Sequence, residues 1–310
     1  MKNEAYQKTG YLHSDFRLFH LTSTEARDFQ SHYHDFHKLL VFLQGSLSYY
    51  IEGETYQLQP YDIVLVPAGE VHHPVIHDDT PYHRVILYIS QDFFEQYRLG
   101  GTDLFRCFSL CAGYGSHILR MEHFRDSRLY PVMQEMILSA GEADEIRSLE
   151  RQKSLPSSGF SDASSFGERS ASLDLYQRSL LLQFLLLLNK YACGSDLSCP
   201  APTSSNPQIL QVLAYINHHL SEELSVDRIA DACYLNRSYL MHLFRRETGY
   251  TLGSYITEKR LFIARNLIQS GTTITDACMQ SGFSGYTSFY RAYRKKFGEP
   301  PKESRRNHLS

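Results

Sequence analysis

The sequence lacks a long hydrophobic run. Its longest uncharged apolar stretch, residues 179–188, has ten residues and includes Gln183, whereas about 20 are needed to cross a bilayer. The N-terminal segment MKNEAYQKTGYLHSDF also lacks the apolar core of a secretory signal peptide. We therefore expect no membrane contact and a cytoplasmic location.

Cysteine is scarce, with six residues and no C-x-x-C pair. Such pairs are typical of zinc sites and redox motifs, and disulfide scaffolds need a much higher cysteine content. We therefore interpret the cysteines as reduced, packed thiols. For Cys107 and Cys111, four residues apart on an expected helix, a metal-flanking pair and a redox pair stay open as alternatives to burial as small apolar side chains.

Charge is divided between the two ends of the chain. The 310 residues are 42% hydrophobic and 21% charged, with a net charge of −3, which is ordinary for a globular protein of about two domains. Residues 1–207 carry 17 Lys and Arg against 25 Asp and Glu, whereas residues 208–310 carry 14 against 9. The C-terminal part, at +5, therefore suits a polyphosphate partner, and the N-terminal part, at −8, does not.

Residues 32–90 are typical of a small β-barrel or sandwich. Short runs rich in Val, Ile, Leu and Tyr, such as HKLLVFLQG and HRVILYIS, are separated by Gly and Pro at even spacing. Helical patterns follow from residue 91 onward. The sequence thus predicts a multidomain α and β protein, in which a barrel and its following helices precede an all-α domain.

Two polar stretches divide the chain. Residues 154–172 contain eight serines, which predicts a mobile insertion. Residues 194–207 contain three prolines where the charge balance changes, which predicts a flexible interdomain linker. We therefore expect a β-barrel over residues 1–105, a helical segment over 106–193 and an all-α domain over 208–310.

A strong helix is expected over residues 173–191, LDLYQRSLLLQFLLLLNKY, which is apolar on more than one face. Such a helix must be covered by its own domain or by a second subunit. It is therefore either internal core or a dimerisation helix, and we expect it to pair two chains into a homodimer.

The C-terminal part contains an internal repeat. Residues 224–249 align with residues 272–298, so that Ala230 matches Cys278 at an offset of 48. Each copy reads as a capped helix, a tight turn and a second helix. Between the copies, residues 254–269 predict one long helix that would act as a stiff spacer.

Capping and periodicity support this interpretation of each copy. Ser225 and Thr273 are the predicted N-caps of the first helices, and Asn236 and Ser284 those of the second helices. Helical spacing also predicts which side chains of the second helices face inward. These are Leu240, Leu243 and Phe244 in one copy, and Phe289 and Tyr293 in the other.

The opposite faces of the two second helices are polar and basic, which suits base edges in a DNA major groove. Successive grooves on one DNA face recur about every 34 Å, so a stiff spacer would let one chain read two turns. An all-α packing domain is the simpler alternative, which two copies in register on the basic end disfavour. The predicted base contacts are Arg237, Ser238, Met241, His242 and Arg245, with Tyr286, Thr287, Tyr290, Arg291 and Arg294; the predicted phosphate contacts are Arg245, Arg246, Arg294, Lys295 and Lys296.

Residues 208–305 resemble the AraC/XylS family of bacterial transcription regulators. The first copy resembles the family pattern at Ile229-Ala230 and Ser238-Tyr239-Leu240, and the second at Gly282-Phe283, Phe289 and Gly298. Two positions depart from the pattern. Tyr234 stands where the family has a turn glycine, and Ser304 stands where it has a tyrosine.

Residues 30–75 resemble the cupin-type sensor found at the front of many such regulators, because HYHDFHKLL and YDIVLVPAGEVHHP are similar to its two strand motifs. In metal-dependent cupins an H-x-H pair, a Glu and a later His ligate one metal. His32, His34 and His72 occupy the histidine positions here, and Lys38 occupies that of the Glu. The resemblance implies a cupin-like barrel that senses an effector without catalysis.

Lys38 decides how these histidines are interpreted. An H-x-H on a strand points both imidazoles to the same face, but an ammonium group disfavours a divalent cation beside it. A metal site of His32, His34 and His72, a polar pocket of His32, His34, Lys38 and His72, and purely structural histidines all stay open. We favour the pocket and expect neither a metal nor another cofactor; His37, His73, His77 and His83 are further candidates near its mouth.

The sequence therefore predicts a non-enzymatic, sequence-specific DNA-binding regulator. Its expected partners are double-stranded DNA, RNA polymerase, a second copy of the chain and a small-molecule effector, a sugar or related metabolite by the resemblance. A cupin-fold metalloenzyme with a helical assembly domain and a DNA binder without an effector are the alternatives.

Overall fold

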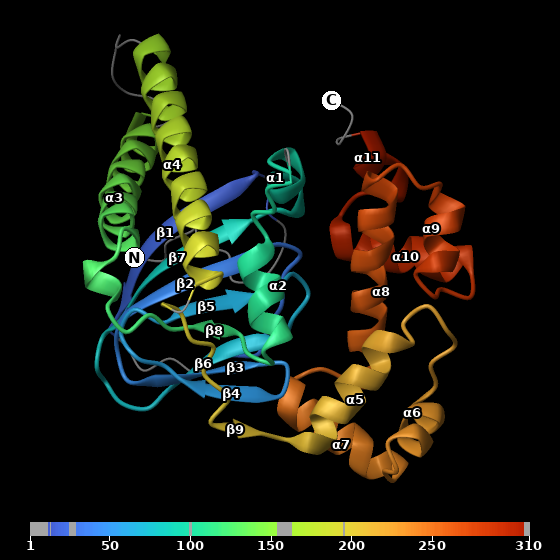
Figure 1. Cartoon of the computed structure of the whole chain (residues 1–310). Helices are drawn as coiled ribbons and strands as arrows, with labels where there is room; N and C mark the ends of the chain where they lie inside the picture. Colours follow the sequence, from blue (N-terminus) through green and yellow to red (C-terminus); the bar gives the residue numbers. More distant parts are fainter. Residues whose placement is uncertain are drawn as a thin grey trace.

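The structure is a computed structural model that describes residues 12, 14–24, 29–98, 101–153, 163–194 and 196–306. Figure 1 shows a β-barrel with two long helices along one side, and an all-helical C-terminal part beside it. The predicted fold class, a cupin-like barrel followed by helices and an all-α domain with two helix-turn-helix motifs, is confirmed.

Two antiparallel sheets form the barrel. The five-stranded sheet has the order β1-β7-β2-β5-β8, and the four-stranded sheet the order β6-β3-β4-β9. The strands of the first are β1 Phe16–Ser23, β7 Tyr82–Ile89, β2 His37–Gln44, β5 Ile63–Val66 and β8 Ile118–Leu119; those of the second are β6 His72–Ile76, β3 Leu47–Ile51, β4 Glu54–Gln57 and β9 Ser204–Ser205.

Alternation along β2 explains why this strand is buried on both faces. Leu40 and Phe42 point into the barrel and pack with side chains of the opposite sheet. Leu39 and Val41 point outward and pack under helices. A strand buried on both sides reads as a continuous hydrophobic run rather than as an alternating one.

Four helices cover the outer face of the five-stranded sheet through one hydrophobic cluster. The two long ones lie side by side and extend past the barrel (Figure 1). The helices are α1 Gln91–Gln96, α2 Arg106–Gly113, α3 Leu129–Lys153 and α4 Ala163–Ala192, with a short 3-10 turn at Phe124–Asp126.

The serine-rich insertion differs from its prediction. Residues 154–162 lie outside the described residues, but α4 already begins at Ala163. The expectation of a mobile segment is therefore wrong for residues 163–172, because serine in a long helix costs only a few tenths of a kcal/mol per residue relative to alanine.

The connection over residues 194–207 is not a free linker either. Ser204 and Ser205 form β9 and pair with Thr55 and Glu54 of the barrel. Farther upstream, the Pro200 carbonyl accepts a hydrogen bond from the Ser116 hydroxyl at 2.7 Å. The expected flexibility is therefore wrong for this part of the connection, which lies against the barrel.

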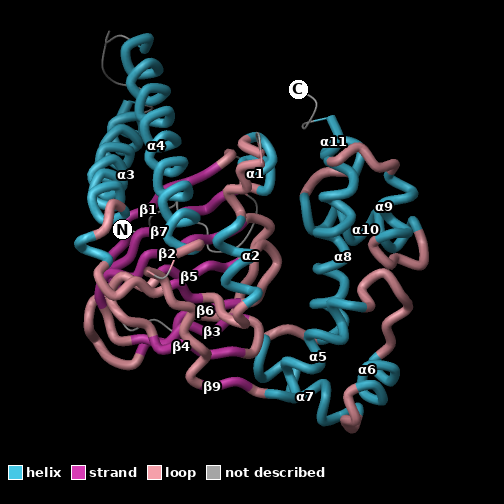
Figure 2. Tube along the Cα trace, in the orientation of Figure 1, coloured by secondary structure: helices cyan, strands magenta, loops and turns pink. Residues whose placement is uncertain are grey.

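The C-terminal part consists of helices (Figure 2). Two hydrophobic clusters, one for each copy of the repeat, meet at the long helix between them. The helices are α5 Pro207–His218, α6 Val226–Ala232, α7 Arg237–Thr248, α8 Leu252–Gln269, α9 Ile274–Gln280, α10 Tyr286–Phe297 and α11 Pro301–Arg306.

Three of the four predicted N-caps are confirmed. The hydroxyls of Ser225 and Thr273 accept from backbone N–H groups of α6 and α9, and the Asn236 side chain accepts from two of α7. The fourth is wrong, because α10 begins one residue later than expected and Gly285, which has no side chain to accept a bond, is its N-cap instead of Ser284.

The barrel and the C-terminal part share a packed interface. The hydrophobic cluster of the first copy includes Tyr33 and Val71 of the barrel. Polar contacts surround it, and one of them is an ion pair between Asp35 Oδ2 and Arg265 Nη1 at 2.5 Å.

Candidate DNA interface and effector pocket

The second helix of the first copy, α7, presents the predicted polar face to solvent. Leu240, Leu243 and Phe244 are buried, as predicted. The turn before the helix passes through Tyr234, which has φ 56° and is 92% exposed. The predicted base-contacting residues Arg237, Ser238, Met241, His242 and Arg245 are all exposed.

The second helix of the second copy, α10, is arranged in the same way. Phe289 and Tyr293 are buried beneath it, and Gly298 ends it with a left-handed φ of 73°, as Gly249 ends α7 with φ 77°. Of the predicted base-contacting residues, Tyr286, Thr287, Arg291 and Arg294 are exposed, and Tyr290 is half-buried.

The spacer between these two helices is the single helix α8. It has 18 residues, which gives a length of about 27 Å at 1.5 Å per residue. The predicted stiff spacer is therefore confirmed, and it begins at Leu252, two residues before its predicted start.

The predicted phosphate contacts are in different surroundings. Arg246 and Lys295 are exposed, and Arg246 forms an ion pair with its neighbour Glu247 at 2.7 Å. Lys296 is half-buried. Its ammonium pairs with Glu258 and donates to the Tyr33 hydroxyl of the barrel at 3.2 Å, so in this arrangement it is engaged within the protein.

Inside the barrel, the structure brings His32, His34 and His72 together. The ring centroids lie 4.4 Å apart for His32 and His72 and 4.8 Å apart for His34 and His72. In each ring Nδ1 lies within 3.0 Å of a backbone carbonyl oxygen, which accepts its proton. Each neutral ring therefore keeps Nε2 as a hydrogen-bond acceptor.

Lys38 lies against this cluster and is 3% exposed. Its ammonium donates to the Tyr49 hydroxyl at 2.8 Å and to His72 Nε2 at 3.4 Å. Burial, followed by the positive charge of Lys38, holds the pKa of His34 and of His72 well below the ordinary value of 6.5. Both rings are therefore uncharged at neutral pH.

Similarity to known proteins agrees with both halves of this picture. A family profile described as an AraC-like ligand binding domain matches residues 18–157, and one described as a helix-turn-helix domain matches residues 229–307. The chain belongs to the AraC family.

Relatives of this AraC-family chain match over nearly its whole length. It is 27% identical to the HTH-type transcriptional activator RhaS of Shigella sonnei (strain Ss046) over 279 residues, 90% of this chain and 88% of that protein. RhaS of Escherichia coli (strain K12) is 26% identical over the same shares. A solved transcriptional regulator with an AraC-type DNA-binding domain from Chromobacterium violaceum is 30% identical, with a TM-score of 0.32, over 34% of this chain and 94% of its own.

The AraC-family barrel does not fit a metal at its histidine cluster. Among the described residues, no group of three or more His, Cys, Asp or Glu side chains is arranged to hold a metal ion. Lys38 explains this, because its ammonium lies within 3.4 Å of His72 Nε2 and so takes the place where a cation would meet the imidazole acceptors.

The other candidate histidines do not join the cluster. His37 packs among Phe94, Phe105 and Phe108 beneath the covering helices. The rest contact polar neighbours elsewhere: His73 meets Ser31, His77 meets Ser48 and His83 meets His20.

Arg84 is a pocket residue that sequence reasoning missed. It is 3% exposed, donates to the Ser23 hydroxyl and to the Tyr82 carbonyl, and lies over the Tyr82 ring. It lines the barrel cavity that Lys38 and His32 also line. The sequence feature that could have revealed it is a charged residue within the hydrophobic run HRVILYIS. In the structure Arg84 pairs with Phe42 of β2 and points into the barrel.

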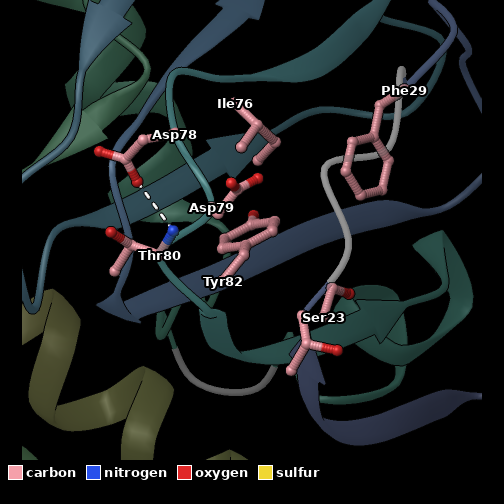
Figure 3. Close-up of a pocket in the computed structure, with 8 residues that line it drawn as sticks. Ser23, Phe29, Ile76, Asp78, Asp79, Thr80 and Tyr82 are labelled. Atoms are coloured by element: carbon pink, nitrogen blue, oxygen red, sulfur yellow. Dashed lines mark hydrogen bonds between the residues drawn. The ribbon is translucent and has the colours of Figure 1, made fainter.

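A second pocket adjoins this cavity at the turn between β6 and β7 (Figure 3). Phe29 and Tyr82 line both. At its edge, Asp78 Oδ1 accepts from the Thr80 N–H at 2.8 Å, the dashed line in Figure 3. The remaining lining residues are Ser23, Thr24, Ile76 and Asp79.

Two expectations from the opening analysis concern cysteines and membranes. Cys107 and Cys111 are buried, and burial raises the pKa of the Cys107 thiol to about 12, which fits packed, protonated thiols. Cys193 is exposed, so the expectation of packing is wrong for it. Of the helices in the described ranges, none is both long and apolar enough to span a membrane.

Proposed function

We propose that this AraC-type DNA-binding regulator reads a specific DNA sequence and responds to a small polar effector in its barrel. The observation that supports it most is the repeat itself, two capped helix-turn-helix units whose outward faces are polar and basic, at the ends of one 18-residue helix. Each outward face suits one major groove.

In this proposal the two outward faces divide their work between bases and phosphates. Short polar side chains and Arg237, Arg245, Arg291 and Arg294 reach base edges, where arginine binds guanine through two hydrogen bonds. Arg246 and Lys295 contact phosphates and fix the register, and Lys296 joins them once it leaves Tyr33. RNA polymerase would be the partner on bound DNA, and the effect would be activation, as in RhaS, the related transcriptional activator.

The effector that suits the barrel carries several hydroxyl groups. His34 Nε2 is buried with no hydrogen-bond partner among the described atoms, and such an acceptor costs free energy until a donor reaches it. A hydroxyl can donate to this nitrogen and also accept from Lys38 or Arg84. This chemistry supports a sugar or related metabolite, which a thermal-shift panel of sugars and sugar acids would identify.

The sharpest test of the DNA-binding proposal is Arg291→Ala. Fluorescence anisotropy with the DNA upstream of its own gene cluster should show binding weakened by about 1–3 kcal/mol, with preference relaxed at one base pair. Arg228→Ala is the matched control, since Arg228 is an exposed arginine of α6 that pairs with Glu222. Equal affinity and equal sequence preference for both variants would contradict the assignment of α10.

A homodimer through α3 and α4 completes the proposal. Large apolar side chains remain exposed on both helices, Leu138 on α3 and Leu175, Tyr176 and Leu186 on α4. Contiguous exposed apolar surface marks an interaction site. Two chains would then present two DNA-binding units, and their joint binding would exceed the affinity of either unit.

A further inference from the structure

One short segment of the barrel, residues 31–35, contacts the C-terminal part with one face and the interior of the barrel with the other. We call it the coupling strip. It runs extended from Ser31 to His34, bends at Asp35 and Phe36, and then enters the strand β2; His32 pairs with His72 of β6 in an isolated bridge. In extended chain, successive side chains point to opposite sides, so odd and even residues of the strip face different parts of the molecule.

The odd residues of the coupling strip hold the C-terminal part. The Ser31 carbonyl accepts from the Tyr250 hydroxyl at 3.4 Å. The Tyr33 ring lies 5.0 Å from that of Tyr250 and accepts Lys296 over its face, with the ammonium 4.7 Å from its centre. The strip is therefore one docking surface for helices α8 and α10 and for the turn after α7, beside Glu52, which pairs with Lys259 of α8.

The last odd residue makes a charged contact. Asp35 forms an ion pair with Arg265 of α8 at 2.5 Å, and both side chains are less than a fifth exposed. Burial raises the pKa of Asp35 to about 6, against the opposing effect of Arg265. Removing one partner of such a pair leaves the other charge in a poorly solvated place, so the docked arrangement depends on this contact.

The even residues of the coupling strip face the inside of the barrel, where His32 lines the proposed effector pocket and His34 packs beside it. His32 and His34 are the two histidines of the H-x-H motif, and both rings contact His72. The chain just before the strip continues the pocket, because Phe29 lines the same cavity as His32 and Lys38. A displacement of the pocket wall therefore moves the backbone that carries the docking residues.

The pocket is closed in the docked arrangement. The cavity volume between its lining side chains is about 10 Å³, no more than one water molecule requires. An effector of sugar size must push part of the wall outward. The other walls belong mainly to the strands β2, β3, β6 and β7, which pair with neighbouring strands over several residues. The strip has fewer backbone bonds to the barrel, namely the pairing of His32 with His72 and the bond from the Gly69 N–H to the His34 carbonyl.

We propose that effector binding displaces the coupling strip, breaks the contacts of Tyr33 and Asp35 with the C-terminal part, frees Lys296 to meet a DNA phosphate, and releases α8, the spacer between the two DNA-binding helices. The proposal rests on the proposed function, since it assigns the regulation of the same pocket and the same helices. The docked chain is the weakly binding form, and the effector shifts the population away from it.

The first experiment weakens docking by a substitution in the barrel, which leaves the DNA-binding helices unchanged. Full-length Asp35→Asn, titrated against the upstream DNA without effector, should bind at least about fivefold tighter than wild type, the lower end of ordinary allosteric coupling. Asp126→Asn is the matched control, because it removes the same charge from an exposed position outside the pockets and the docking surface. Equal affinities of Asp35→Asn, the control and wild type would refute the proposal.

The second experiment imitates the effector by overfilling the cavity. Leu40→Phe places a bulkier aromatic side chain in the pocket that Leu40 lines. Leu39→Phe makes the same substitution on the outward face of the same strand. Leu40→Phe should tighten DNA binding and Leu39→Phe should not. Combined with Asp35→Asn, Leu40→Phe should add less than it does alone, since both act on one equilibrium; full additivity would contradict a shared strip.

The third experiment locks the C-terminal part onto the barrel with a disulfide. A Cβ placed on Gly249 would lie 3.1 Å from Ser31 Cβ, so a disulfide, whose Cβ atoms lie about 3.5–4.5 Å apart, forms once the two segments move apart by a few tenths of an ångström. Oxidised Ser31→Cys/Gly249→Cys protein should bind DNA several-fold more weakly than the same sample after reduction, with Ser31→Cys alone unchanged by oxidation. Equal binding in both redox states would overturn the inference.

The outcomes separate this inference from the proposed function. If wild type, Asp35→Asn and the reduced cysteine variant all fail to bind the upstream DNA specifically, the function itself is wrong. If they bind DNA with the same affinity regardless of oxidation, pocket filling or the Asp35 contact, the proposed DNA-binding function is retained and the role of the coupling strip is refuted.

Discussion

A glycine in a turn allows the second helix-turn-helix unit to pack closely against the first. Gly282, in the turn between α9 and α10, has φ 88°, and a Cβ there would lie 2.1 Å from the Leu220 carbonyl oxygen and 2.9 Å from Arg260 Nε. That carbonyl already accepts from Arg260 Nε at 2.8 Å. The turn is therefore packed against the end of α5, which ties the second copy to the first.

Gly282→Ala is expected to destabilise the chain by about 2–3 kcal/mol. The left-handed conformation costs an alanine about 1–2 kcal/mol, and displacing the carbonyl disturbs a buried hydrogen bond worth about 1 kcal/mol. Gly271→Ala is the control, because Gly271 has φ 97° but nothing within 4 Å of a Cβ. Urea denaturation should show the larger loss for Gly282→Ala; equal losses would mean that the close contact costs nothing.

At the residue scale, the sequence predicted what local chemistry determines. The caps Ser225, Asn236 and Thr273 were correct because a side chain three residues ahead of a helical N–H is a local relation. Ser284 was wrong because Gly285 can also begin a helix, and the choice depends on packing around the turn. Arg84 was missed because its role depends on which strands face each other across the barrel.

At the scale of elements, α4 shows how far a hydrophobic pattern extends. Its buried side packs on the barrel cluster through Leu181, Phe184, Leu185 and Leu188. This side of the helix is internal core, which is one of the two roles expected from the sequence. Leu175 is 67% and Leu186 49% exposed on the remaining surface. The helix therefore has apolar side chains beyond those that its own domain covers.

Leu186→Lys is expected to weaken dimerisation at least about tenfold while leaving the monomer fold intact. A charge at an apolar contact is costly for association, whereas an exposed substitution changes folding stability by about 0.5 kcal/mol or less. Sedimentation equilibrium measures the first and thermal unfolding the second. Met279→Lys, at a 62% exposed position of α9, is the control. An unchanged association constant for Leu186→Lys would exclude this face from the dimer.

Element boundaries were predicted where periodicity was strong and missed where polar composition suggested loops. The spacer helix was placed within two residues, because its apolar spacing is regular. The serine-rich residues 163–172 form helix because serine disfavours a helix only weakly. Residues 204–205 form a strand because they pair with Glu54 and Thr55 of the barrel.

At the scale of the whole molecule, the contact between barrel and C-terminal part could not be predicted. Asp35 and Arg265 are 230 residues apart in the sequence, and nothing local marks either as a partner of the other. The sequence predicted that His32 and His34 lie on one face, and both rings lie beside His72, yet it did not show that Tyr33 between them faces another domain. That information exists only once both domains are folded and docked.

The interface also contains a cluster of carboxylates that should make the docked molecule sensitive to pH. Burial, followed by the charge of Glu52, raises the pKa of Glu70 to about 8, with Lys259 acting in the opposite direction and Glu54 in the same direction. His117 Nδ1 lies 3.4 Å from Glu70 Oε2. Glu70 is thus protonated in the docked form at neutral pH, although its ordinary value is 4.5.

A raised carboxyl pKa makes the folded, docked chain lose stability as pH rises. Between about pH 5 and pH 8 the folded chain holds a proton on Glu70 that the unfolded chain has released, so stability falls by up to about 1.4 kcal/mol per pH unit and then levels off. Glu70→Gln cannot ionise and should flatten the decline of the melting temperature across this window, while Glu223→Gln, at an exposed position, should follow wild type. A Glu70→Gln profile as steep as that of wild type would show that Glu70 is already ionised in the docked molecule, and that Lys259 and His117 outweigh burial and Glu52.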